Sequence, residues 1–371
     1  MSRYPHMKNI TLSAVLGVAV IIGVVLFTTY NTPQDDPIKI GVVYGLTGPA
    51  SSWTDYGIKA AELAVSEINE NGGVNGRLVE LVIEDSNSSP AKAVAAYQKL
   101  TDIDKVGAVI GDVWSFITNP LIPVIEDKKV VLISPTVMDM AVEGQSDYFY
   151  SMGHTVESIR QPVQKFFEAN KDIKTVSVLC WNDAWGQAHT ALYKQVAGEY
   201  GVTVLGEVCL NDFASDYRTE MTKIKVQDPD AIMMVVAYPD IAMRAYKALG
   251  MDQKVLTTYI TDAIELRDMP RTDAQNLWFI DWMPNAEFVT KFKAKYGAYP
   301  ILEAQNHYDT IYAIAHALEN NPDSISVGLK TVKFDGVDGT IDFTQGDHHT
   351  VNTSKAKLYR VDPVSGYTEV K

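Results

Sequence analysis

The sequence of 371 residues is poor in cysteine and in basic side chains. Its only cysteines are Cys180 and Cys209, and no CxxC pair, HExxH or cysteine–histidine cluster occurs, so no structural zinc site is expected. The 46 aspartates and glutamates outnumber the 32 lysines and arginines, which gives a formal net charge of −14. Nucleic acid is therefore excluded as a partner, because binding it requires a basic surface that displaces counterions.

Catalytic signatures are missing as well. The sequence contains no GxSxG, no GxxxxGK[ST] and no GxGxxG that follows a strand. Neither a nucleophile–base set nor a metal-ligand set is visible, so the chain is expected to be no enzyme and to need no cofactor.

Each cysteine stands at the end of an apolar run, VSVLC for Cys180 and LGEVC for Cys209. A thiol at the end of a buried strand usually behaves as a small hydrophobic side chain, and we favour this interpretation over a disulfide. An oxidising compartment would permit the bridge, but the sequence does not determine its geometry.

The N-terminal part has the composition of a membrane or signal segment. A basic leader over residues 1–9 precedes an uncharged apolar run at 10–27. This order predicts a signal or anchor helix over 10–30 and a linker over 31–37. No small-x-small cleavage site stands out, which favours an uncleaved anchor over a signal peptide. The positive flank should stay inside, so the rest of the chain should lie on the extracytoplasmic side of the membrane.

From residue 38 onward, strand-like and helix-like patterns alternate. IKIGVVYG, RLVELVIED, VGAVIGDV and KVVLISPT are apolar runs separated by helical stretches, and KTVSVLCWND begins a second such series. One predicted helix lies at about 118–126, between VGAVIGDV and KVVLISPT, and another at about 286–296. Buried parallel strands connected by helices account for this pattern, so it predicts an α/β fold of two doubly wound lobes. Ligands of such sheets bind beyond the carboxyl ends of the strands.

Polar and aromatic residues stand where these strands end. Ser115 begins a predicted helix, where it either holds a ligand carboxylate or acts as an ordinary N-cap. Asp262 follows VLTTYI and either meets an ammonium group or caps a helix. Trp53, Trp185 and Tyr238 suit a cleft that excludes water, although an aromatic residue of this kind, taken singly, is more often a packing residue.

The stretch AAELAVSEINENGGVNGRLVELVIEDS resembles the type I periplasmic binding proteins, in the leucine/isoleucine/valine-binding branch that serves ABC transporters. The resemblance continues in order through VGAVIGD, KVVLISPT, WNDAWGQ, YITDA and AQNHYDTIYAIAHAL, and it covers essentially everything from Ile38 to the end. It implies two lobes joined by a three-strand hinge. One lobe should take residues 38–155 and 285–330, and the other 156–284 and 331–371.

The resemblance also implies roles for individual residues. It assigns Ser115 to the ligand carboxylate and Asp262 to the ligand amino group. It places Trp53, Trp185 and Tyr238 around the cleft, and Trp114, the neighbour of Ser115, belongs to the same predicted site.

Two departures from the family pattern concern the ligand. Where amino-acid binders have a threonine in SPxAT, this chain reads SPTVM, so Met138 takes the place and Thr136 is a candidate substitute. An apolar position near AQNHY is occupied by Glu303. A carboxylate facing the cleft would disfavour an aliphatic ligand and favour a polar or cationic solute, or a small amide such as urea.

The sequence thus predicts a solute-binding component of an ABC importer, which captures an amino acid or similar small polar solute. Its expected partners are that solute, an ABC permease and, through the N-terminal segment, the membrane. A sensor of the same fold is the main alternative, because fold alone does not decide between transport and signalling. A urea- or amide-binding protein for an importer is the second alternative.

Overall fold

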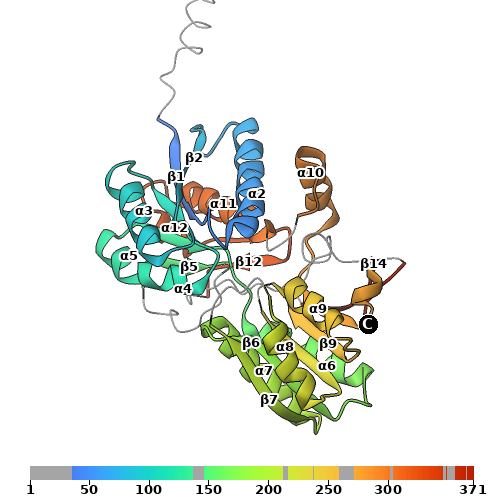
Figure 1. Ribbon diagram of the computed structural model, residues 1–371. Helices are drawn as coiled ribbons and strands as arrows, with labels where there is room; N and C mark the ends of the chain where they lie inside the picture. Colours follow the sequence, from blue (N-terminus) through green and yellow to red (C-terminus); the bar gives the residue numbers. More distant parts are fainter. Residues whose placement is uncertain are drawn as a thin grey trace, which may run out of the picture.

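The buried run Ile38–Tyr44 forms strand β1 at the interior of the first sheet (Figure 1). The structure is a computed structural model that describes residues 36–136, 146–211, 216–236, 238–258, 271–300, 304–345, 348, 356–364 and 366–371. All pairs in this sheet are parallel. Its spatial order is β2 (Val79–Asp85), β1, β3 (Ala108–Ile110), β4 (Val131–Ser134) and β5 (Phe149–Ser151). We call this sheet with its helices lobe 1.

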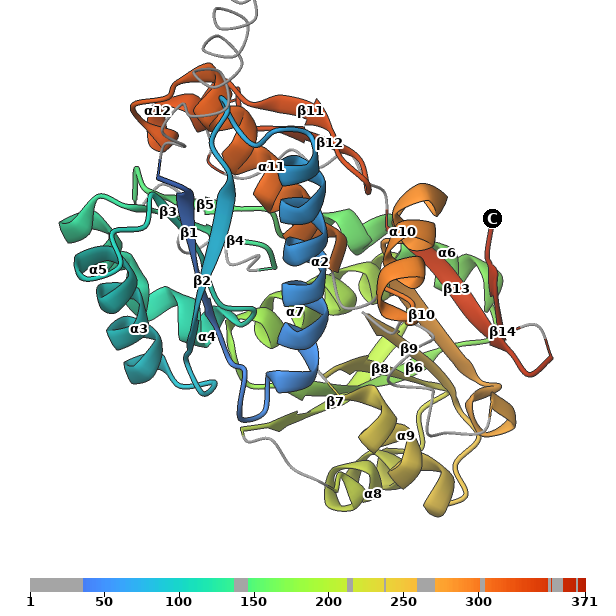
Figure 2. The same ribbon diagram turned by 90° about the horizontal axis from the view of Figure 1, so that it is seen from above.

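Helices cover both faces of the lobe 1 sheet (Figure 2). Helices α2 (Ser51–Glu70) and α11 (Ala304–Asn320) pack together on one face. The other face carries α3 (Pro90–Asp102), α4 (Ser115–Thr118), the 3₁₀ turn η1 (Asn119–Leu121) and α5 (Ile122–Lys128). Helix α12 (Ile325–Leu329) follows α11 and contacts it.

One predicted helix is broken in the structure. The sequence predicts a helix over residues 118–126, but the chain forms α4, η1 and α5 in succession. Pro120 and Pro123 explain the break, because each lacks the N–H that a continuous helix would use. Both prolines stand in the first two positions of a new segment, where the missing donor is not needed.

A seven-stranded sheet forms the second lobe, lobe 2. Its order is β14 (Gly366–Glu369), β13 (Lys357–Asp362), β10 (Leu277–Asp281), β9 (Lys254–Thr258), β8 (Ala231–Val235), β6 (Thr175–Trp181) and β7 (Thr203–Leu210). The strands from β7 to β10 are parallel, and the C-terminal hairpin β13–β14 adds antiparallel strands at one edge. The sequence prediction of two parallel sheets is therefore confirmed.

Alternate side chains of β6 serve two different cores. Val176 and Val178 pack with the helices α6 (Arg160–Ala169) and α7 (Ala184–Glu199). Leu179 belongs instead to the cluster that includes α8 (Arg218–Gln227) and α9 (Pro239–Ala248). This is the period of two that a strand buried on both faces requires.

Both sheets are wound in the same order. In lobe 1, β2 lies on one side of β1, and β3, β4 and β5 follow in order on the other side. The parallel part of lobe 2 repeats this order with β7, β6, β8, β9 and β10. The winding direction reverses between β1 and β3 and again between β6 and β8, and ligand crevices of open α/β sheets lie at such points.

The chain passes between the lobes at places that contact each other. It leaves lobe 1 between β5 and the 3₁₀ turn η3 (Val156–Ile159), returns between β10 and α10 (Ala286–Tyr296), and enters lobe 2 again before β13. His154 of the first crossing stacks on Trp282 of the second, with ring centroids 4.3 Å apart. The Nε2 atom of His154 also lies 3.1 Å from a carboxylate oxygen of Asp338. These contacts make the first two crossings one packed hinge.

Two further small elements complete the described chain. The 3₁₀ turn η4 (Arg271–Ala274) precedes β10, and the antiparallel hairpin β11 (Lys333–Asp335)–β12 (Thr340–Asp342) follows α12. The backbone N–H of Val337 in this hairpin donates to both carboxylate oxygens of Asp309 on α11 (3.2 and 3.0 Å). The assignment of residues 331–371 to the second lobe, like the other lobe boundaries, stays a prediction.

The interpretation of Cys180 and Cys209 as free thiols is wrong. The two residues are exact neighbours in the register of β6 and β7, with Cα atoms 4.4 Å apart, and they form a disulfide bond. The sequence places each cysteine at a strand end, but it does not show that the two strands pair. Pairing brings the thiols together, and the bond joins edge strand β7 to the interior of the sheet.

The predicted anchor or signal helix at residues 10–30 lies outside the described residues. Among the helices that the structure describes, none is both long enough and apolar enough to cross a membrane.

Candidate ligand-binding site

The candidate site lies at the carboxyl ends of strands in both lobes. In lobe 1, Trp114 and Ser115 follow β3, and Trp53 lies in the first turn of the helix after β1. In lobe 2, β6 ends on Trp181, and Tyr238 stands between β8 and α9. These are the strands that flank the two points where the winding reverses, so the folds of both lobes position the site.

Four aromatic rings connect the lobes. The ring centroid of Trp114 lies 6.3 Å from that of Trp53 and 6.0 Å from that of Trp181. The ring of Trp181 lies in turn 6.4 Å from that of Tyr238. We call Trp53, Trp114, Trp181 and Tyr238 the interlobe aromatic cluster. Its three tryptophans are buried, and rings packed in this way exclude water from the space between the lobes.

Ser115 heads α4 and is almost fully buried. The first N–H groups of a helix have no partner within that helix, so they can donate hydrogen bonds to an anion. A serine hydroxyl beside them adds a further donor. This combination suits a carboxylate.

Asp112 holds the loop that carries Ser115. Its carboxylate is buried, accepts a hydrogen bond of 2.5 Å from the Ser86 hydroxyl, and accepts another of 2.7 Å from the backbone N–H of Val113. Burial raises the pKa of Asp112 to about 6, and the hydrogen bonds from Ser86 and Val113 oppose that rise. Asp112 was not among the predicted site residues, although in VGAVIGD it stands only two residues after the end of β3.

Thr136 joins two loops of lobe 1. Its hydroxyl donates to the carbonyl oxygen of Val113 at 2.7 Å, and the side chain is buried. The single hydroxyl proton is therefore in use inside the protein. The oxygen keeps lone pairs, so Thr136 is suited to accept a hydrogen bond from a ligand N–H group.

Tyr238 makes a direct hydrogen bond between the lobes. Its hydroxyl donates to the carbonyl oxygen of Pro49, in the loop between β1 and α2. Tyr238 is predicted to line the cleft, and its ring belongs to the interlobe aromatic cluster. The contact with Pro49 is a second role, which the sequence did not indicate.

Trp185 and Trp181 lie in different surroundings. Trp185 on α7 packs its ring against His189, with centroids 4.8 Å apart, and joins the hydrophobic cluster of lobe 2. Trp181, which the sequence analysis missed, contacts both Trp114 and Tyr238. A signal was present, because Trp181 is the last residue of the strand in KTVSVLCWND, where the ligand end of a parallel strand lies. Trp185 stays a predicted site residue.

Three predicted site residues, Asp262, Met138 and Glu303, lie outside the described residues. Their proposed roles stay predictions.

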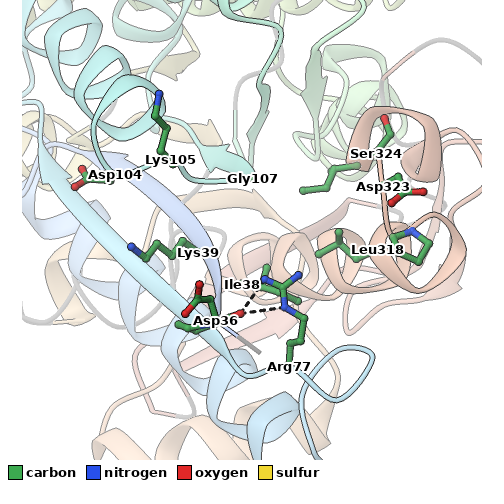
Figure 3. A pocket seen from close by; sticks show the side chains of 13 residues that line it. Asp36, Ile38, Lys39, Arg77, Asp104, Lys105, Gly107, Leu318, Asp323 and Ser324 are labelled. Atoms are coloured by element: carbon green, nitrogen blue, oxygen red, sulfur yellow. Dashed lines mark hydrogen bonds between the residues drawn. The ribbon is translucent and has the colours of Figure 1, made fainter. Parts of the chain in front are cut away.

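A cavity of about 650 Å³ lies at the opposite edge of the lobe 1 sheet. It opens between the starts of β1 and β3 and the corner that joins α11 to α12. Figure 3 shows Arg77 reaching across it, where its Nε and Nη2 atoms donate to the carbonyl oxygen of Asp36 at 3.0 and 2.8 Å. Lys39 and Lys105 lie on one side and Leu318 and Asp323 on the other. The amino edge of a parallel sheet is not its usual ligand edge, so this cavity is separate from the candidate site.

The chain is similar to known proteins over most of its length. A family model described as "Periplasmic binding protein" matches residues 37–366. A Pseudomonas aeruginosa protein named leucine-, isoleucine-, valine-, threonine- and alanine-binding protein is 26% identical over 340 residues, which cover 86% of this chain and 88% of that one.

Solved structures share the fold over most of their length. The branched-chain amino acid transporter substrate-binding protein of Streptococcus pneumoniae, in complex with isoleucine, has a TM-score of 0.80 and 25% identity, covering 90% of this chain and 99% of that one. A leucine-binding protein from Thermotoga maritima has a TM-score of 0.77 and 22% identity, covering 90% and 98%. The second likeness, at its lower identity, concerns the fold alone.

Proposed function

Because this chain belongs to the periplasmic binding protein family, we propose that it captures an amino acid, or a similarly small polar solute, and delivers it to an ABC permease. Membership of the family makes the chain a solute-binding protein that works outside the cytoplasm, and it is not an enzyme. The relatives named above bind branched-chain or small amino acids, which supports an amino acid as the solute.

Lobe 1 offers the groups that the carboxylate of an amino acid requires. Ser115 supplies a hydroxyl and, with Phe116, the first N–H groups of α4. Hydrogen bonds from such groups to an ionised carboxylate are stronger than bonds between neutral groups. Asp112 fixes the loop from behind, since its carboxylate accepts the N–H of Val113. We therefore assign the carboxylate of the ligand to Ser115.

The ammonium group requires acceptors. Thr136 is one, because its proton is already donated to Val113 and only the oxygen lone pairs remain for a ligand. Asp262 is the second proposed acceptor, on the resemblance to the family. The ligand would then be bound at both ends, with its side chain next to the interlobe aromatic cluster.

The observation that carries this proposal is the interlobe aromatic cluster. It consists of four rings from the two lobes, which lie at the carboxyl ends of the strands in both sheets. A solute bound there is shielded from water when the lobes close. A ligand that contacts both lobes stabilises the closed state by its differential affinity for that state.

A thermal-shift screen followed by calorimetry tests the proposal. Residues 36–371 would be titrated with leucine, isoleucine, valine, threonine, alanine, arginine and urea. Binding stabilises the folded protein by mass action, by about 2.7 kcal/mol at a hundredfold excess over the dissociation constant. A shift with an amino acid supports the proposal. A shift with urea alone would identify urea rather than an amino acid as the solute. The absence of a shift with all seven compounds would contradict amino-acid capture.

The proposal includes the membrane. Residues 10–30, outside the described part of the chain, would anchor the protein at the extracytoplasmic face, where a permease receives the solute. Fractionation of cells that produce the full chain, with and without residues 1–30, tests this point. Recovery of the full chain from the soluble extracytoplasmic fraction would contradict anchoring.

A further inference from the structure

We propose that Tyr238 is a latch residue: the bond from its hydroxyl to the Pro49 carbonyl stabilises the closed arrangement of the lobes even without a ligand. The inference rests on the proposed function in one respect, namely that the lobes open and close around a solute. It deepens that function, because it assigns part of the closing free energy to the protein itself.

The acceptor is held firmly within lobe 1. Pro49 belongs to the loop between β1 and α2, and the next residue, Ala50, donates its N–H to the Ser88 hydroxyl at 3.0 Å. Earlier in the loop, the Thr47 hydroxyl donates to a carboxylate oxygen of Asp85 at 2.6 Å. Asp85 is the last residue of β2 and Ser88 lies in the loop after it, so this loop and the loop between β1 and α2 hold each other in place. The Pro49 carbonyl therefore keeps its position in lobe 1 whether or not lobe 2 is near.

The donor is held with similar firmness in lobe 2. Tyr238 is the residue before α9, and Pro239, the first residue of that helix, restricts the backbone at this point. The ring of Tyr238 packs against Trp181, the last residue of β6. Donor and acceptor are each fixed to a different lobe, so the remaining variable is the angle between the lobes.

The bond consequently reports and stabilises closure. When the lobes separate, the hydrogen bond between the Tyr238 hydroxyl and the Pro49 carbonyl breaks, and each group then bonds to water. The net contribution of such a bond corresponds to about a two- to twelvefold change in the closing equilibrium. If the ligand binds the closed state, its apparent affinity changes in proportion to the closed fraction.

A latch differs from a ligand contact in what it leaves unchanged. Loss of a ligand contact alters the ratio of affinities for two solutes that differ at the contacted group. Loss of a latch lowers both affinities by the same factor, and it does so through faster release, because closure follows encounter.

The test uses Tyr238→Phe, with Tyr97→Phe as the matched control. Tyr97 donates its hydroxyl to the Val130 carbonyl at 2.6 Å, and both residues belong to lobe 1. The two variants therefore lose the same kind of bond, across the lobes in one case and within a lobe in the other. Circular dichroism and a urea titration of each variant establish that it is folded.

The first readout is the distance between the lobes, measured by electron–electron double resonance on spin labels. The labels sit on Lys92→Cys in lobe 1 and Lys223→Cys in lobe 2, which replace exposed residues. The native cysteines are joined and do not take the label. Without ligand, Tyr238→Phe should lower the ratio of closed to open molecules by about two- to twelvefold, whereas Tyr97→Phe should leave it unchanged.

The second readout is the kinetics of binding, with leucine and isoleucine as probes. Tyr238→Phe should raise both dissociation rates by a common factor and leave the ratio of the two affinities as it is. An unchanged closed fraction, a wild-type protein without any closed fraction, or a changed affinity ratio would each overturn the latch. If neither probe binds the wild-type protein, the amino-acid proposal fails, while the ligand-free distances still decide the latch.

Discussion

Loss of the disulfide between Cys180 and Cys209 should destabilise lobe 2 by about 3–4 kcal/mol. The cysteines are separated by 29 residues, and a cross-link over a loop of that length removes roughly 12 cal/mol/K from the unfolded chain. At 25 °C this entropy corresponds to about 3.6 kcal/mol. The bridge ties edge strand β7 to β6, so we expect the effect to be centred on these two strands.

The perturbation is the double variant Cys180→Ala, Cys209→Ser. Alanine suits the first position because Cys180 is buried, and a serine hydroxyl there would need a partner. Serine suits the second because Cys209 is exposed. Urea unfolding gives the free-energy difference, and amide hydrogen exchange shows where protection is lost. Exchange in β6 and β7 should accelerate, while exchange in β1 and β3 should stay as it is.

The wild-type protein unfolded in the presence of a reductant serves as the control, and it should behave like the double variant. A difference in unfolding free energy below about 0.5 kcal/mol would refute the argument from chain entropy. A loss of protection spread evenly over both lobes would refute its assignment to β6 and β7.

Three further predictions concern the site and its support. Gly186→Ala should destabilise the protein by about 1–3 kcal/mol, because a Cβ atom there would lie 2.0 Å from the Trp181 carbonyl oxygen. In the same helix, the added Cβ atom of Gly198→Ala meets no atom within 4 Å, so this variant should be more stable by about 0.5–1 kcal/mol. If thermal unfolding ranks the two variants in the opposite order, the packing described at α7 is contradicted. Burial raises the pKa of Asp112 to about 6 from 3.8, so the folded state binds the proton more tightly than the unfolded chain, and stability should fall as pH rises through this interval. The expected loss of unfolding free energy between pH 3.8 and pH 6 is about 3 kcal/mol, measured by urea titration at several pH values. Asp112→Asn should abolish this loss, and an equal loss in the variant would show that another group is responsible. Ser115→Ala should weaken amino-acid binding by about ten- to a hundredfold in calorimetry, because a hydrogen bond to a charged group is lost; an unchanged affinity would remove Ser115 from the site.

Much of the fold could be predicted because buried parallel strands leave a strong local pattern. The run Ile38–Tyr44 is mostly apolar and rich in isoleucine and valine, and it forms the strand expected of it. Helix α10 spans Ala286–Tyr296, the same residues that the apolar periodicity indicates. Local patterns fail where proline interrupts them, as Pro120 and Pro123 do in the segment that becomes α4, η1 and α5.

The candidate site was harder to predict, because it depends on which strands are neighbours. Cys180 and Cys209 each look like an ordinary strand end, and only the pairing of β6 with β7 reveals their bond. Trp181 is likewise an unremarkable last residue of a strand until β6 lies beside β8 and faces Trp114. Strand order and the angle between the lobes are long-range properties, and one sequence contains no periodic signal for them.

The packed hinge limits how the two halves of the molecule can move. His154 and Trp282 stack at 4.3 Å, so the first two crossings cannot slide apart independently and behave as one pivot. A pivot of this kind permits rotation but little translation, and displacement then grows with distance from the axis. The hinge residues would move least and the far rim of the cleft most, as in a lever. A solute held near the rim would therefore exert more torque on the closing motion than one held beside His154.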